Sequence, residues 1–194
     1  MSFKLIVITP DKNHPKEFEL ITLLFESGLQ TLHVRKPQAT ENELKNYLKQ
    51  ITRKFYKKIV IHSHYKLAKE FNLKGIHLTE KARKAKRINP SFKIISTSFH
   101  ATTAVLKSRR KYEYVFLSPV FDSISKKGYK GNFDLKELKP FLKKNKNIVA
   151  LGGANTKNIE IVKQIGFTGA AVIGTVWQSK NPVNSYKELV LKIK

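Results

Sequence analysis

The chain has 194 residues, a length that suits one domain with a sizeable buried core. It contains no cysteine, which excludes disulfides, thiolate metal ligands and a cysteine nucleophile, and which fits a reducing cytoplasm. The net charge is +24, but only six of the 38 basic residues are arginine, and the lysines are spread along the chain. Because arginine is the usual reader of bases, this composition argues against nucleic acid as a partner and favours small anions.

Eight short runs of apolar, β-branched residues predict β-strands. They span Lys4–Ile8, Thr31–Val34, Ile59–His62, Gly75–Leu78, Lys93–Ser96, Tyr114–Leu117, Asn147–Leu151 and Gly169–Ile173. The segments between them favour helices, because their apolar residues recur at helical spacing. These helical segments are Glu17–Ser27, a helix capped by Thr40, Tyr65–Phe71, a turn or two within Glu80–Arg87, Ala101–Lys107, Leu135–Lys143, Asn158–Ile165, a start at Thr175, and Asn184–Lys192.

Strands that alternate with helices predict a parallel sheet, and eight of them without a Gly/Ser linker predict one closed barrel. The expected fold is α/β, a single compact (β/α)8 TIM barrel with trimmed loops over residues 1–194. An open doubly wound sheet is the alternative. It would need a glycine-rich turn after the first strand, where Thr9, Pro10 and Asp11 stand instead.

No apolar run approaches the length of a membrane span, and the run near the N-terminus is too short for a signal peptide. We therefore expect a cytoplasmic protein that does not bind a membrane.

Two glycine turns close the last two predicted strands. Gly152 and Gly153 follow the seventh strand, and Gly174 and Thr175 follow the eighth, each in front of a predicted helix. Glycine lets an anion approach backbone N–H groups, and a helix N-terminus supplies positive potential. A (β/α)8 barrel places its phosphate site after strands 7 and 8, so we predict phosphate binding here. Two ordinary strand-to-loop turns are the alternative.

Five of the six histidines lie at or just after carboxyl ends of predicted strands, which converge on one mouth of a barrel. They are His33, His62, His64, His77 and His100. Strand alternation places His62 and His64 on one face. Such histidines can bind an anion, transfer protons or hold a metal. No carboxylate accompanies the pair on these strands, so we predict no metal ligands.

Other polar residues are expected at the same mouth. Arg35 and Lys36 follow the second strand, and the loop from Ser118 to Gly128 carries the hydroxyls of Ser123 and Ser125 and two lysines. This loop is either a lid over an anionic substrate or a basic surface loop.

Six segments of the chain resemble the thiamine phosphate synthase family, which includes the thiazole tautomerases, in their order and spacing. They are Leu32–Lys36, Gly75–Leu78, Ser98–His100, Ser118–Lys126, Val149–Gly153 and Ala171–Thr175. The resemblance covers essentially the whole chain and implies a (β/α)8 barrel. It also implies one of two activities. The synthase joins hydroxymethylpyrimidine diphosphate to thiazole phosphate and releases pyrophosphate, with Mg²⁺ on the diphosphate; the tautomerase isomerises a carboxythiazole phosphate.

Carried over position by position, the resemblance implies that Gly153, Gly174 and Thr175 bind the thiazole phosphate. It implies that the family's hydroxyl-x-hydroxyl-Lys segment, here Ser123, Ser125 and Lys126, binds the diphosphate. The site residues predicted from residues and resemblance together are Arg35, Lys126, His62, His64 and His100 for catalysis; Gly152, Gly153, Gly174 and Thr175 for phosphate; and His33, Lys36, Ser98, Ser123 and Ser125 for substrate or diphosphate.

The chain departs from the family pattern at several of these positions. His33 replaces a glutamine, and Pro37 stands where the family has a lysine. Ser63 and Ala82 occupy the positions of the two Mg²⁺-binding carboxylates. Pro119 matches the synthase, whereas the tautomerase has its catalytic histidine there.

Four hypotheses follow. The first is an enzyme of thiamine phosphate synthesis whose basic pocket neutralises the diphosphate. The second is a tautomerase-like relative that transfers protons through His62, His64 or His100. The third is a protein that binds thiazole or thiamine phosphate without chemistry, and the fourth, ranked last, is a basic barrel that binds nucleic acid. The expected partners are phosphorylated small molecules, and the sequence leaves a homodimer open.

Overall fold

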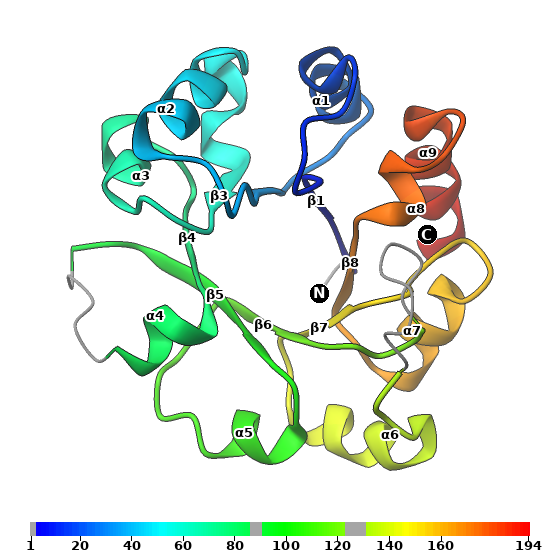
Figure 1. Cartoon of the computed structure of the whole chain (residues 1–194). Helices are drawn as coiled ribbons and strands as arrows, with labels where there is room; N and C mark the ends of the chain where they lie inside the picture. Colours follow the sequence, from blue (N-terminus) through cyan, green and yellow to red (C-terminus); the bar gives the residue numbers. More distant parts are fainter. Residues whose placement is uncertain (1–2, 86–90, 123–130) are drawn as a thin grey trace.

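The computed structural model describes residues 3–85, 91–122 and 131–194, and its strands close into a parallel barrel in chain order (Figure 1). The strands are β1 (Lys4–Ile8), β2 (Leu32–Val34), β3 (Ile59–Ile61), β4 (Gly75–Leu78), β5 (Ile94–Phe99), β6 (Tyr114–Leu117), β7 (Ile148–Leu151) and β8 (Gly169–Val172). β1 pairs with β8 to close the ring. The predicted (β/α)8 barrel is confirmed.

The helices lie outside the ring of strands (Figure 1). They are α1 (Glu17–Glu26), α2 (Glu41–Lys49), the 3-10 helix η1 (Arg53–Lys58), α3 (Lys66–Glu70), α4 (Glu80–Lys84), α5 (Thr102–Leu106), α6 (Leu135–Lys144), α7 (Ile159–Ile165), α8 (Gly174–Trp177) and α9 (Pro182–Ile193). Of the helices in the described ranges, none is both long and apolar enough to cross a membrane.

Local sequence explains where several helices begin. Thr40 caps α2: its hydroxyl accepts from the N–H of Glu43, whose carboxylate accepts from the N–H of Thr40 in return. Asn181 caps α9 in the same sense, and Pro182 sits in the first turn, where no N–H is needed. The sequence pattern did not predict η1, which is a tight connection in front of β3.

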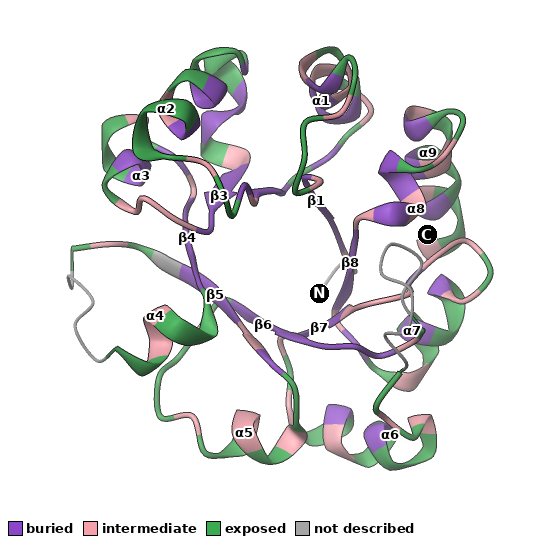
Figure 2. Cartoon of the chain, viewed as in Figure 1, coloured by how far each residue is buried: buried purple, intermediate pink, exposed green. Residues whose placement is uncertain are grey.

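Alternation along the strands builds two cores. Ile6 and Ile8 of β1 point into the barrel, whereas Leu5 and Val7 point outward against the helices. Most residues of the strands are accordingly buried, as Figure 2 shows. The cluster inside the barrel is small and mostly apolar, with Ile6, Ile8 and Val60 among its members. Toward the carboxyl ends of the strands, polar side chains such as His62 and Ser98 line the interior instead.

β5 differs from the sequence prediction. It runs to Phe99, beyond the predicted end at Ser96. The prediction stopped early because the second half of the strand is rich in hydroxyl residues and lacks an apolar pattern. The pairing of β4 with β5 also slips by one residue: Ile76 pairs with Ile94, but His77 pairs with Ser96. Such a bulge reverses the alternation that follows it. It turns Ser96 and Ser98 toward His77 and into the barrel.

Candidate functional site

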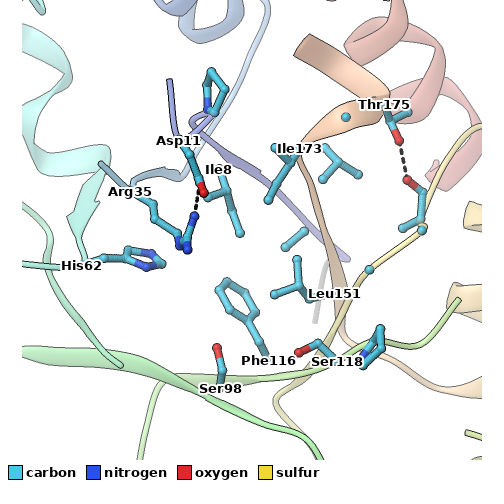
Figure 3. Close-up of a pocket in the computed structure, with 18 of the residues that line it drawn as sticks. Ile8, Asp11, Arg35, His62, Ser98, Phe116, Ser118, Leu151, Ile173 and Thr175 are labelled. Carbon is cyan, nitrogen blue, oxygen red and sulfur yellow. Dashed lines mark hydrogen bonds and ion pairs between the residues drawn. The ribbon is translucent and has the colours of Figure 1, made fainter. Parts of the chain in front are cut away.

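A cavity of about 630 Å³ opens at the mouth formed by the carboxyl ends of the strands. Phe116 and Leu151 form an apolar floor, and polar groups surround it (Figure 3). Arg35 and His62 lie on one side of this cavity, and Thr175 lies on the opposite side (Figure 3). An apolar pocket with a few convergent polar groups is the usual form of a ligand site.

The glycine turn after β7 lines the cavity with bare backbone. Gly152 and Gly153 have φ angles of +96° and +69°, in the left-handed region that favours glycine. A Cβ atom on Gly153 would lie 2.3 Å from the carbonyl oxygen of Asp122. Both conformation and space therefore require glycine here.

The turn after β8 is tied to the turn after β7. Gly174 begins α8, and the hydroxyl of Thr175 donates to the carbonyl of Ala154 at 2.6 Å (Figure 3). The side-chain amide of Asn158 donates to the carbonyl of Gly153 at 3.0 Å and holds it in place. All four predicted phosphate-binding residues thus line one side of the same cavity. Their role in phosphate binding stays a prediction.

Arg35 and Lys36 have different positions despite their adjacency. Arg35 lines the cavity and forms an ion pair with Asp11 (Figure 3). Lys36 is buried away from the cavity, with its Nζ 2.9 Å from Oε1 of Glu17, and the hydroxyl of Tyr47 donates to the same carboxylate at 2.6 Å. The structure therefore gives Lys36 a position under the rim rather than one that faces the predicted diphosphate.

Three histidines come together inside the barrel. Nδ1 of His33 lies 2.8 Å from Nε2 of His62, and Nε2 of His33 lies 2.6 Å from the hydroxyl of Tyr114. The ring of His77 stacks on His62, with centroids 4.2 Å apart. His62 and His77 line the cavity, whereas His33 is fully buried behind them.

The surroundings keep these imidazoles neutral. Burial lowers the pKa of His77 to about 3, and the positive charge of Arg35 adds to the shift. Burial likewise holds the pKa values of His33 and His62 well below the usual value, and His77 contributes next in both cases. At neutral pH they act as hydrogen-bond partners and bases rather than as cationic anion ligands.

The other predicted site residues are divided. Ser98 and His100 line the cavity, and Nδ1 of His100 lies 2.9 Å from the carbonyl of Ser118. His64 does not share a face with His62, and that prediction was wrong, because β3 ends at Ile61 and His64 has a φ of 48°. Its Nε2 lies 2.8 Å from the carbonyl of Ala39. Ser123, Ser125 and Lys126 lie outside the described residues.

Sequence reasoning missed Asp11, Ser96 and Tyr114 as parts of this site. Alternation along β6 would have placed Tyr114 on the inner face with Phe116, as observed. The inward position of Ser96 depends on the bulge, for which the sequence holds no clear signal.

The carboxylates that line the cavity are those of Asp11 and Glu80, and neither stands at a position that the resemblance assigns to a Mg²⁺ ligand. Mg²⁺ requires oxygen ligands. In the described ranges, the group of three side chains able to hold a metal together consists of His33, His62 and His77, all nitrogen donors. Neither Ser63 nor Ala82 lines the cavity, and neither carries a carboxylate.

The eight parallel strands that close in chain order, with a cavity at their carboxyl ends, define a (β/α)8 barrel, and glycine turns after β7 and β8 line that cavity. Residues 5–176 match the family model described as thiamine monophosphate synthase. The chain belongs to this family.

Individual relatives agree with the family match. A solved thiamine phosphate pyrophosphorylase from Bacteroides thetaiotaomicron is 32% identical, with a TM-score of 0.82 over 97% of this chain and 96% of that one. A thiamine-phosphate synthase of Desulfitobacterium hafniense is 27% identical over 91% of this chain and 89% of its own length. The synthase of Prochlorococcus marinus is 26% identical over the whole chain, which spans 57% of that relative. The chain likewise spans 61% of the relative from Latilactobacillus sakei.

Proposed function

We propose that this chain is a transferase of the thiamine phosphate synthase type, which joins hydroxymethylpyrimidine diphosphate to thiazole phosphate and releases pyrophosphate. The observation that carries the proposal is the family match over residues 5–176 together with a cavity whose one side is glycine backbone and whose other side carries Arg35. Pro119 lines this cavity at the position where the tautomerases carry their histidine, which favours the synthase over that relative.

The thiazole phosphate would bind at the β7–β8 side. Backbone N–H groups of Gly153, Gly174 and Thr175 would supply donors there, and the absence of side chains on the two glycines lets phosphate oxygens approach them. This leaves the heterocycle over the apolar floor at Phe116 and Leu151.

The diphosphate would bind on the opposite side, beside Arg35. The C–O bond to the diphosphate breaks with its electron pair on pyrophosphate, and the aminopyrimidine carries the resulting positive charge. The lone pair of the thiazole nitrogen then forms the new C–N bond. Arg35 stabilises the leaving anion, and the lysines of the loop after β6 are proposed to assist it. Asp11 would have to yield its ion pair with Arg35 to the diphosphate.

Pyrophosphate release from the two substrates tests this function directly. The wild-type chain should release pyrophosphate, measured both with Mg²⁺ and with a chelator, and Arg35→Gln should lower the rate by about 100-fold, the loss of one charge-stabilising donor. Arg53→Gln, an exposed arginine outside this cavity, is the matched control and should keep the wild-type rate. No release under either condition would contradict the proposal.

A further inference from the structure

The buried histidines belong to a longer chain of hydrogen bonds, and its course suggests a use. One branch begins at the cavity with His62, continues to His33 at 2.8 Å and ends on the hydroxyl of Tyr114 at 2.6 Å. Nδ1 of His62 has no hydrogen-bond partner among the described residues. The enclosed side-chain polar atom without a partner in those residues is Nε of Arg83, so Nδ1 of His62 is not enclosed and is open to the cavity that His62 lines.

A second branch also begins at the cavity. The hydroxyl of Ser98 lies 3.1 Å from Nε2 of His77, and Nδ1 of His77 lies 2.8 Å from the hydroxyl of Ser96. Ser96 and Tyr114 are register partners on the adjacent strands β5 and β6, so the inner ends of the two branches lie side by side. Burial raises the pKa of Tyr114, and the neighbouring Ser96 hydroxyl opposes that shift. The branches therefore meet deep in the barrel. The histidine network is the set of Ser98, His77, Ser96, Tyr114, His33 and His62.

We propose that the histidine network is a proton relay with both ends in the cavity. Each member offers one donor and one acceptor in its neutral form, so all the bonds can point one way or all can point the other. In one state His62 presents an N–H to the cavity and Ser98 presents a lone pair. In the other state Ser98 presents its O–H and His62 presents the lone pair of Nδ1.

Switching between these states moves a proton across the cavity without charging the protein. A bound ligand gives a proton to one end, each hydrogen bond passes one proton along, and the other end returns a proton to a different atom of that ligand. No electrons are transferred, and the proton count of the protein is unchanged. Neutral imidazoles suit this role, because each can accept a proton on one nitrogen while it releases another.

The ligand class rests on the function proposed above: a nitrogen heterocycle. Loss of pyrophosphate leaves positive charge on an aminopyrimidine and makes its N–H groups more acidic. A base at one end of the network can remove such a proton while the carbon–nitrogen bond forms, and the network can then return it. His62 and Ser98 would contact the ligand; the four inner residues act through them as positioning residues.

The same histidines make a poorer metal site. The rings of His62 and His77 are nearly parallel, with 18° between their planes, so their in-plane lone pairs do not converge on one ion. Both nitrogens of His33 and both of His77 already have partners. Arg35 lies close enough to lower the pKa of His62 and His77, and it would repel a dication as well.

Tyr114→Phe tests the relay, because it keeps the ring and removes the hydroxyl that joins the two branches. We expect turnover to fall by about 100-fold with an unchanged KM, in the range of acid–base effects, and the solvent isotope effect of the wild type to be lost. Tyr56→Phe is the matched control, since its hydroxyl donates to the carbonyl of Leu48 outside the network. Ser96→Ala opens the other branch and replaces Tyr114→Phe if that variant fails to fold.

Nitrogen NMR of histidine-labelled protein gives a readout that does not need activity. Removal of the Tyr114 hydroxyl should shift the tautomer of His62, two members away along the network, whereas Tyr56→Phe should not. An unchanged His62 tautomer in Tyr114→Phe would overturn the relay, and so would wild-type turnover of that variant. Stoichiometric Zn²⁺ binding that His33→Gln abolishes and His64→Gln preserves would also overturn it. If the wild type releases no pyrophosphate, the proposed function fails and the NMR result still decides the relay.

Discussion

The two sides of the barrel mouth are built from different parts of the chain. The β7–β8 side presents backbone, held by glycine conformations and by the bond from Thr175 to Ala154. The β2–β4 side presents side chains: Arg35 at the rim and histidines beneath it. By the resemblance drawn from the sequence, the first side keeps the residues of the family pattern and the second departs from them.

This contrast shows how differently the two sides tolerate change. A binding site made of backbone groups is blocked when a side chain is added to one of its glycines, so few residue types are tolerated at those positions. A network of side chains needs only that donors and acceptors balance, so histidine can replace other residue types if the neighbours provide partners. Four experiments test whether the two sides differ in this way.

The largest effect is expected under the β2 rim, at Lys36. Lys36→Met should lower the free energy of unfolding by about 3–5 kcal/mol, because it leaves the buried carboxylate of Glu17 without its ion partner. Urea unfolding measures this change. The neighbouring Arg35→Met, whose side chain faces the cavity, serves as comparison and should cost far less. Equal losses of unfolding free energy in Lys36→Met and Arg35→Met would contradict the separate roles of the buried Lys36 and the cavity-lining Arg35.

Gly153→Ala examines the backbone side. It should lower the free energy of unfolding by about 2–3 kcal/mol, from left-handed strain plus overpacking against Asp122, and weaken thiazole phosphate binding at least 10-fold, about 1.4 kcal/mol. Calorimetric titration and urea unfolding measure the two effects. Gly28→Ala is a matched control, because Gly28 has a φ of +100° and nothing lies within 4 Å of an added Cβ. This variant should lose stability through backbone strain but should bind thiazole phosphate like the wild type.

The pH dependence of stability reports on the histidine side. Burial and Arg35 depress the folded-state pKa of His77 to about 3, so below pH 6.5 the unfolded chain binds more protons than the folded one. Stability is therefore fully present above the unfolded pKa and falls as the solution is acidified. The contribution of His77 is about 1.6 kcal/mol between pH 6.5 and pH 5. His77→Gln should reduce this slope in urea unfolding; an unchanged slope would contradict a neutral, buried His77.

The smallest effect is expected at Thr175. Thr175→Val removes the hydroxyl that donates to Ala154 and should cost about 1 kcal/mol of stability, the usual net value of one hydrogen bond. Thr168→Val, at the start of β8, removes a similar bond to the carbonyl of Ile148 far from the cavity. Both should destabilise to a similar extent, but only the first should weaken binding of thiazole phosphate in a titration. Equal binding by both variants would remove Thr175 from the phosphate side.

Much of the fold could be read from local pattern. The apolar runs predicted β1, β4 and β6 at their observed ends, and the capping box at Thr40 predicted the start of α2. These features depend on neighbours in sequence, so the chain carries them without a tertiary context. The glycine turns after β7 and β8 were predictable for the same reason, since their conformations and their place after the last two strands are local properties.

Tertiary structure decided which polar residues meet. Adjacent Arg35 and Lys36 separate because one faces the cavity and the other finds Glu17 and Tyr47 behind the rim. His62 and His64 separate because the chain leaves β3 and turns at His64. A one-residue slip between β4 and β5 aims Ser96 and Ser98 at His77 and brings Tyr114 into the same network. Local sequence was enough to predict the barrel and its glycine turns. Contacts between residues distant along the chain, and the desolvation that keeps the histidines neutral, exist only once the barrel has closed.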